Sequence, residues 1–178
     1  MSPIFRKIFW GYILTIFDIR IFIDILIDPI GYYLIYSGIK QLINKFPIGN
    51  KSKYVSLALI FYSIPSIFYE DTLNDWDWYY GIFSLMDLIL VFYLFQLIIE
   101  IAKAANDPSF EKRSLWTGRI YFINIFIIYL FSSFLPNIPL NNSLIFISII
   151  ILLSTLVLEI MFLVLLWATR NLYVKLDE

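Results

Sequence analysis

The stretch YYGIFSLMDLILVFYLFQLIIEIA, residues 79–102, decides the class of this protein. It exceeds the roughly 20 apolar residues that a helix needs to cross a bilayer. Three further stretches have a similar length and character, at residues 54–69, 115–135 and 143–168. A soluble domain of 178 residues has no interior large enough to bury all four. We therefore predict an integral membrane protein.

The composition agrees with this class and excludes much chemistry. Apolar residues make up 61% of the chain and aromatic residues 20%, and the mean hydropathy is +0.81. The chain has no cysteine and no histidine, which excludes disulfides, thiol nucleophiles, imidazole bases and Cys/His metal sites. It also lacks a phosphate loop and a dinucleotide fingerprint. We expect no enzymatic activity, no cofactor, no bound metal and no nucleic-acid partner.

The distribution of charge predicts how the chain is oriented. Lysine and arginine mark cytoplasmic loops, whereas the acidic connector at residues 70–77 is expected outside. Arg20 is then the one external residue among the 13 lysines and arginines, and both termini are cytoplasmic. The twelve internal residues are Arg6, Lys7, Lys40, Lys45, Lys51, Lys53, Lys103, Lys112, Arg113, Arg119, Arg170 and Lys175.

Both ends of residues 8–39 consequently face the cytoplasm, so this segment has to turn back on itself. Within DIRIFIDILIDPIGYYLIYSG, residues 18–38, the pair Asp28-Pro29 is typical of a helix start. The preceding DIRIFID is then the external turn. The alternative is a re-entrant hairpin, because arms of roughly 16 residues give only about 24 Å of helix. No cleavage site follows the first apolar segment, which we expect to remain in the mature protein.

The predicted fold is all-α: a polytopic transmembrane helical bundle of about six helices forming a single domain over residues 1–178. The helices are expected at about residues 3–18, 29–45, 54–69, 79–102, 115–135 and 143–168. Pro65 is expected to kink the third helix. Asp107-Pro108 is expected to cap a brief cytoplasmic helix that runs through Arg113.

Ionisable residues inside the spans are the site candidates, because each costs about 2.5–3.5 kcal/mol to insert. Asp87 lies about 12 Å from the outer edge by helical rise, at a level that the external turn can reach. The candidate polar site therefore comprises Arg20, Asp24, Asp28 and Asp87 on the outer side. Glu159 is a further candidate, eight residues from Trp167 on the inner side. This count places Asp87 and Glu159 in opposite halves of the bilayer, without a shared two-carboxylate site.

Several residues near these candidates have structural explanations. Asp28 is explained by helix capping, and Glu100 and Arg119 are expected to be boundary charges that reach the membrane surface. Gly31 and Gly38, seven residues apart on the second helix, are predicted to let helices pack closely in lipid.

The N-terminal quarter resembles a family of uncharacterised small multi-spanning membrane proteins of low-GC Gram-positive bacteria. The family has a run of the form D-I-L-P-D-x-I-G-Y, preceded by a first helix with a glycine and an aromatic residue. The matching residues here are Gly11-Tyr12, Asp18-Ile19-Arg20 and the run from Asp24 to Tyr32, followed by Gly38. Ile27 stands where the family tends to have proline, and Pro29 follows the second aspartate. The resemblance implies a bacterial membrane protein and brings no activity with it.

These observations predict a multi-pass protein of a bacterial plasma membrane that acts by binding. The leading interpretation is a transport-associated subunit that binds a solute or another membrane protein. The alternative is a bacteriocin-type immunity or sensor-accessory protein, whose acidic connector attracts a cationic peptide. A third is an intramembrane enzyme that uses carboxylates. The partners expected are therefore the lipid bilayer, and a small solute or a second membrane protein.

Overall fold

The computed structural model describes residues 3–16, 27–65, 77–137, 139 and 141–177. These residues form six α-helices and one short 3-10 helix, which confirms the all-helical fold class. Their bounds are α1 (Pro3–Ile16), α2 (Ile27–Ile39), α3 (Gly49–Tyr62), α4 (Asp77–Ala104), α5 (Pro108–Phe134), η3 (Leu135–Asn137) and α6 (Asn142–Asp177).

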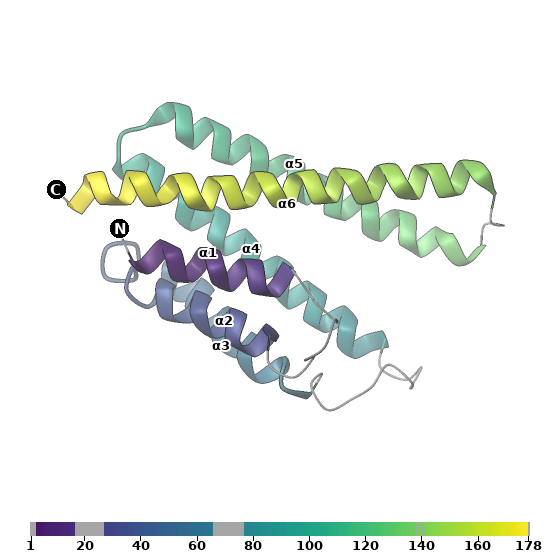
Figure 1. Cartoon of the computed structure of the whole chain (residues 1–178), viewed down its shortest axis with the longest axis horizontal. Coiled ribbons are helices and arrows are strands. Elements are labelled where there is room, and N and C mark those ends of the chain that lie inside the picture. The colour runs from purple at the N-terminus through teal and green to yellow at the C-terminus, as the bar shows by residue number, and fades with distance from the viewer. Residues whose placement is uncertain (1–2, 17–26, 66–76, 138, 140, 178) are drawn as a thin grey trace.

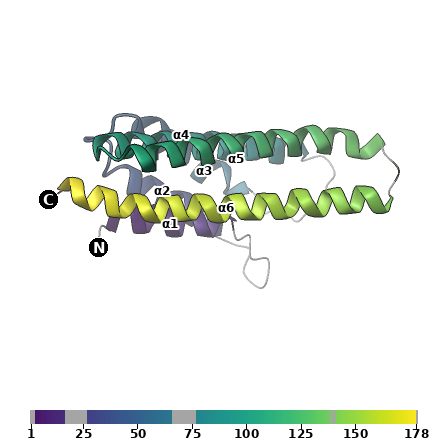
Figure 2. The same ribbon diagram turned by 90° about the horizontal axis from the view of Figure 1, so that it is seen from above.

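The helices fall into a long set and a short set (Figure 1). Three helices are long and apolar enough to cross a membrane, at Trp78–Ala104, Pro108–Phe134 and Asn142–Leu176. By contrast, α1, α2 and α3 have 14, 13 and 14 residues. At 1.5 Å per residue they reach about 20 Å, short of the roughly 30 Å of a hydrocarbon core. The three short helices lie beside the half of α6 that carries the C-terminus (Figures 1 and 2).

Several predicted helix bounds are wrong: α3 begins at Gly49 rather than at residue 54, and α6 continues to Asp177 rather than ending at residue 168. Two helices also end earlier than predicted, for local reasons. The second helix ends at Ile39 rather than near residue 45, and the chain passes through turns around Pro47 before α3 begins at Gly49. The third helix ends at Tyr62, so Pro65 follows the helix instead of kinking it. Proline disfavours helical geometry in the residue before it, which agrees with a helix that ends before Pro65.

The start of α5 shows how one cap can begin a long helix. The side chain of Asp107 accepts a hydrogen bond of 2.9 Å from the backbone N–H of Phe110, and Pro108 is the first helical residue. The expected cap is present, but the brief separate helix is not. Residues 108–113 are instead the first turns of α5, which continues without a break to Phe134.

Glycine brings α1 and α2 together. A Cβ atom on Gly11 would lie 2.6 Å from the carbonyl oxygen of Gly31, and one on Gly38 would lie 2.5 Å from Cγ1 of Ile8. Both distances are too short for a real side chain, so the two backbones touch where these glycines lie. The structure thus places Gly31 and Gly38 at the α1–α2 contact.

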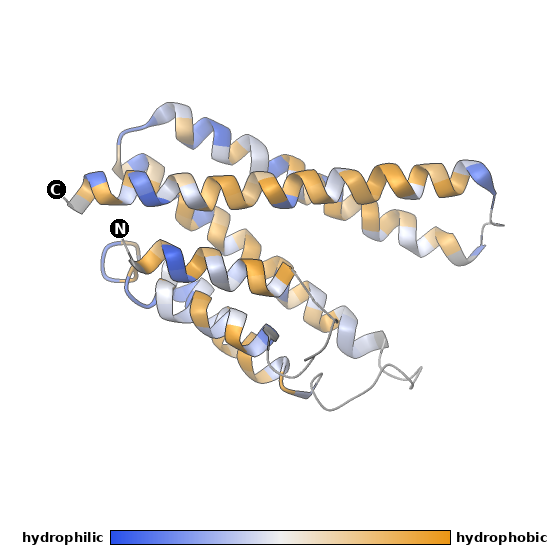
Figure 3. Cartoon of the chain, in the orientation of Figure 1, coloured by the Kyte–Doolittle hydropathy of each residue, from blue (hydrophilic) through white to orange (hydrophobic). Residues whose placement is uncertain are grey.

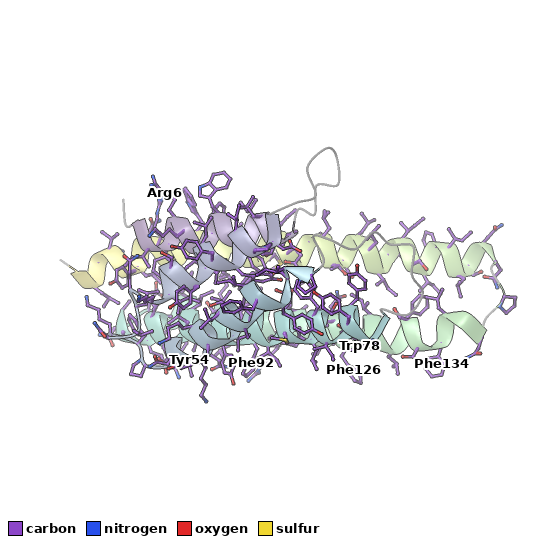
Figure 4. The ribbon with its side chains drawn as sticks, turned by 90° about the horizontal axis from the view of Figure 1, so that it is seen from below. Arg6, Tyr54, Trp78, Phe92, Phe126 and Phe134 are labelled. Carbon is purple, nitrogen blue, oxygen red and sulfur yellow. The ribbon has the colours of Figure 1, made fainter. Side chains whose placement is uncertain are left out.

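Apolar residues predominate along the long helices (Figure 3), and many of their side chains are exposed. Phe126 and Phe134 of α5 are 68% and 56% exposed and project from the bundle, as does Trp78 of α4 (Figure 4). A surface of this kind is unfavourable in water and suited to lipid. The polar residues gather instead at the end where the two termini lie (Figure 3).

Candidate functional site

Glu159 is held by two tyrosines from two other helices. The Tyr12 hydroxyl of α1 donates to Oε2 of Glu159 at 2.7 Å, and the Tyr121 hydroxyl of α5 donates to Oε1 at 2.7 Å. Both rings are buried, with 2% and 4% of their surface exposed. Glu159 itself lies at the middle of α6. The carboxylate therefore links α1, α5 and α6 through short, charge-assisted hydrogen bonds.

Aromatic packing fixes the positions of these tyrosines. The ring of Tyr12 meets Phe162 edge-on at 4.7 Å between centroids, and Phe162 contacts Phe95 at 4.6 Å. The ring of Tyr121 lies 5.7 Å from Phe95. Phe95 and Phe162 are among the largest fully buried side chains of the described residues. The hydroxyl groups are thus aimed at Glu159 by a rigid apolar surround.

A second carboxylate, Asp87 of α4, has a similar environment. The Tyr32 hydroxyl of α2 donates to Oδ1 of Asp87 at 3.0 Å. Phe83, one turn earlier on α4, packs edge-on against the ring of Tyr32 at 5.9 Å. Tyr32 is 2% exposed, so its hydroxyl also lies within the bundle.

The two carboxylates belong to one polar centre, contrary to the prediction that they lie apart. Gly11 and Gly31 touch, and the next residues on their helices are Tyr12 and Tyr32, whose hydroxyls donate to Glu159 and to Asp87 respectively. The two carboxylates therefore lie at a similar level in the bundle. Figure 1 shows the reason: α4 crosses α6 obliquely, so residue counts from the helix ends do not give the level of a side chain. We call Asp87, Glu159, Tyr12, Tyr32 and Tyr121 the carboxylate centre.

The other predicted site residues divide into two groups. Asp28, near the start of α2, lies one turn before Tyr32, whose hydroxyl donates to Asp87. Arg20 and Asp24 lie outside the described residues, as do the acidic residues 70–76. Of the predicted outer cluster, the described residues therefore include Asp28 and Asp87.

A polar seam between α5 and α6 continues from the carboxylate centre. Asn124 donates from Nδ2 to Oγ1 of Thr155 at 3.2 Å and accepts at Oδ1 from Ser154 at 2.8 Å. Asn124 lies one turn beyond Tyr121, and Thr155 lies one turn from Glu159. The predicted site residues did not include Asn124, Ser154 or Thr155, although their spacing of three to four residues from the centre places them on the same helix faces.

The tyrosines were also missed. Each tyrosine lies in an apolar stretch, and tyrosine in such a stretch usually marks the membrane interface. The local sequence therefore does not indicate that the hydroxyl binds a buried carboxylate. A signal was present in hindsight, because a buried carboxylate needs donors and this chain has no histidine to supply them.

Within the described residues, no lysine or arginine forms an ion pair with Asp87 or Glu159. The ion pair found there joins Lys103 to Glu111, at 3.7 Å and near the cytoplasmic ends expected for α4 and α5. The described residues also contain no group of three His, Cys, Asp or Glu side chains able to hold a metal ion. What this part of the chain offers is two acceptor carboxylates, three hydroxyl groups and aromatic walls.

In comparisons with known proteins, no family model, no curated protein and no solved structure matches the chain. The resemblance over residues 11–38 therefore stays a prediction. The site has to be interpreted from its own geometry.

Proposed function

We propose that this chain is a multi-pass protein of a bacterial plasma membrane that binds a cationic solute at the carboxylate centre, as the binding subunit of a transport system. Both termini lie in the cytoplasm in this proposal. Three long apolar helices support insertion in a membrane. The orientation is supported by the basic residues of the α2–α3 connection, of the adjoining ends of α4 and α5, and of the end of α6.

The observation that carries the proposal is the geometry at Glu159. Both carboxylate oxygens accept hydrogen bonds from buried tyrosines, at the middle of the longest helix. The two tyrosine hydroxyls donate hydrogen bonds to the carboxylate but bring no positive charge to it. Asp87 adds a second carboxylate at a similar level, held by Tyr32. Such a centre favours a cation, and charged groups inside a membrane commonly mark ion and substrate paths.

The surrounding rings support an organic cation over a bare metal ion. Divalent cations prefer several oxygen ligands, which the described residues do not supply as a cluster. Aromatic faces attract ammonium groups. Phe83 packs beside Asp87's partner Tyr32, and Phe162 packs beside Glu159's partner Tyr12. An ammonium group near these carboxylates would have both charge and aromatic partners.

The test is a thermal unfolding screen of the purified protein in detergent micelles at constant ionic strength. Sodium, potassium, choline and longer alkylammonium chlorides are compared. A ligand at 100 times its Kd stabilises the folded protein by about 2.7 kcal/mol. We expect an alkylammonium ion to raise the Tm of the wild type.

The matched variants are E159Q and E100Q. The amide introduced by E159Q can still accept from one tyrosine and donate to the other, so the fold should persist while the charge is lost. Glu100 lies on α4 toward the end of the helix at Ala104. The shift should disappear in E159Q and remain in E100Q. A cation-dependent shift of equal size in E159Q would refute the proposal.

A further inference from the structure

Helices α1 and α6 lie side by side and run in opposite directions, with the two termini at the same end (Figures 1 and 2). Phe5 packs against Tyr173 at 5.6 Å, and Phe9 packs against Trp167 at 5.3 Å. Arg6 lies three residues from Phe9 toward that end, and Arg170 lies three residues from Trp167 toward the same end. Each step is about 4.5 Å of helix. The two arginines therefore lie at the same level on neighbouring helices.

One nitrogen of the Arg170 guanidinium group has no hydrogen-bond partner in the part of the chain that the structure describes. Its Cζ lies 4.0 Å from the centroid of the Trp167 ring. Nε and Nη2 both reach Oδ1 of Asn171, at 3.4 and 3.2 Å. Nη1 is buried and has no hydrogen-bond partner among the described residues. A buried donor without an acceptor is unfavourable, so the group is arranged for an acceptor that this part of the chain does not provide.

Arg6 adds a second positive charge at this position. Its side chain is exposed and projects away from the bundle (Figure 4). No described carboxylate pairs with either arginine, since the ion pair in that part of the chain joins Lys103 and Glu111. Two guanidinium groups at one level match a phosphate, which arginine binds through paired N–H groups.

The surroundings identify the source of that phosphate. Trp10 and Trp167 are 53% and 42% exposed, and tryptophan collects where a membrane meets water. A soluble phosphate ion has no apolar part that could pack against these rings, whereas a phospholipid has acyl chains next to its phosphate headgroup.

We propose that Arg6 and Arg170 bind the phosphate of an anionic phospholipid where α1 and α6 lie side by side. Trp167 and Phe9 lie along its glycerol and upper acyl chain. This site is separate from the carboxylate centre and does not depend on the function proposed for it.

The test is lipid titration of the purified full chain in detergent micelles, read by native mass spectrometry. Phosphatidylglycerol and phosphatidylcholine are added separately to the wild type, R6Q, R170Q, the double variant R6Q/R170Q and the control K112Q. Lys112 is exposed on α5 and belongs to the same basic end of the molecule. We expect the double variant to bind phosphatidylglycerol at least about tenfold more weakly, and K112Q to match the wild type.

Three results would overturn the proposal. The first is that the wild type binds both lipids equally. The second is that K112Q loses as much affinity as the double variant, because binding would then depend on the overall positive charge of this end and not on the two arginines. Displacement of the lipid by millimolar sodium phosphate is the third, since it would identify a soluble ligand. If R170Q lowers the helix content by circular dichroism, the exposed R6Q carries the test, and unchanged binding in R6Q overturns the proposal.

Discussion

Replacing Gly31 by alanine should force α1 and α2 apart. The new Cβ would lie 2.7 Å from Cγ2 of Thr15 and 2.8 Å from the carbonyl oxygen of Gly11, whereas ordinary contact begins at 3.4 Å. Thr15 cannot turn away freely, because its hydroxyl donates to the carbonyl of Tyr12 at 2.9 Å. The backbone of α1 therefore has to move by about 0.6 Å to restore contact with Gly11.

Overpacking of this kind costs about 1–3 kcal/mol. Alanine also raises helix propensity by roughly 0.8–1 kcal/mol, which offsets part of that cost. Gly81 on α4 separates the two effects, since a Cβ there would meet nothing within 4 Å. The stability difference between G31A and G81A should therefore be the packing cost alone.

The assay is thermal unfolding of both variants in the same detergent, followed by circular dichroism. A change of 1 kcal/mol shifts the Tm of a chain this size by about 2–4 °C. G31A should thus melt about 2–12 °C below G81A. A Tm for G31A equal to or above that of G81A would mean that the close approach of α1 and α2 is wrong.

Two further predictions concern the ends and the seam of the long helices. Asp107→Ala should lower the free energy of unfolding by about 1 kcal/mol, because the backbone N–H of Phe110 loses its acceptor. Denaturant titration measures this loss, with Asp107→Asn as the conservative control. An unchanged unfolding midpoint in Asp107→Ala would count against the cap. Asn124→Ala should cost about 0.6 kcal/mol and at most about 1.7, because without Asn124 the Ser154 hydroxyl can donate to the Ile151 carbonyl instead, and Thr155 already has that acceptor. A loss above about 3 kcal/mol in the same titration would contradict the modest role assigned to the seam.

The sequence predicts the helical class because its signal is strong and local. The runs that became α4, α5 and α6 are long and apolar, and the Asp107-Pro108 cap was identifiable from residue type alone. The N-terminal helices are shorter than the expected spans, since Pro47 and Pro65 lie beyond helix ends rather than inside a helix. A proline can either kink or end a helix, and sequence does not choose between these outcomes.

The candidate site depends on geometry that sequence does not contain. Asp87 and Glu159 were identified as costly residues, but their association depends on the oblique crossing of α4 and α6 (Figure 1). The partners Tyr12 and Tyr121 come from two other helices, at separations of 147 and 38 residues from Glu159. Periodicity places a residue on a face of its own helix, whereas only packing decides what that face meets.

The most direct test of the cation-binding centre is infrared difference spectroscopy of Glu159. Spectra of the protein in lipid vesicles are recorded with and without the alkylammonium ion that stabilises it most, for the wild type, E159Q and E100Q. Binding should perturb carboxylate stretching bands in the wild type and in E100Q, and those bands should vanish in E159Q. Identical difference bands in E159Q would contradict the account, because the cation would then be held elsewhere.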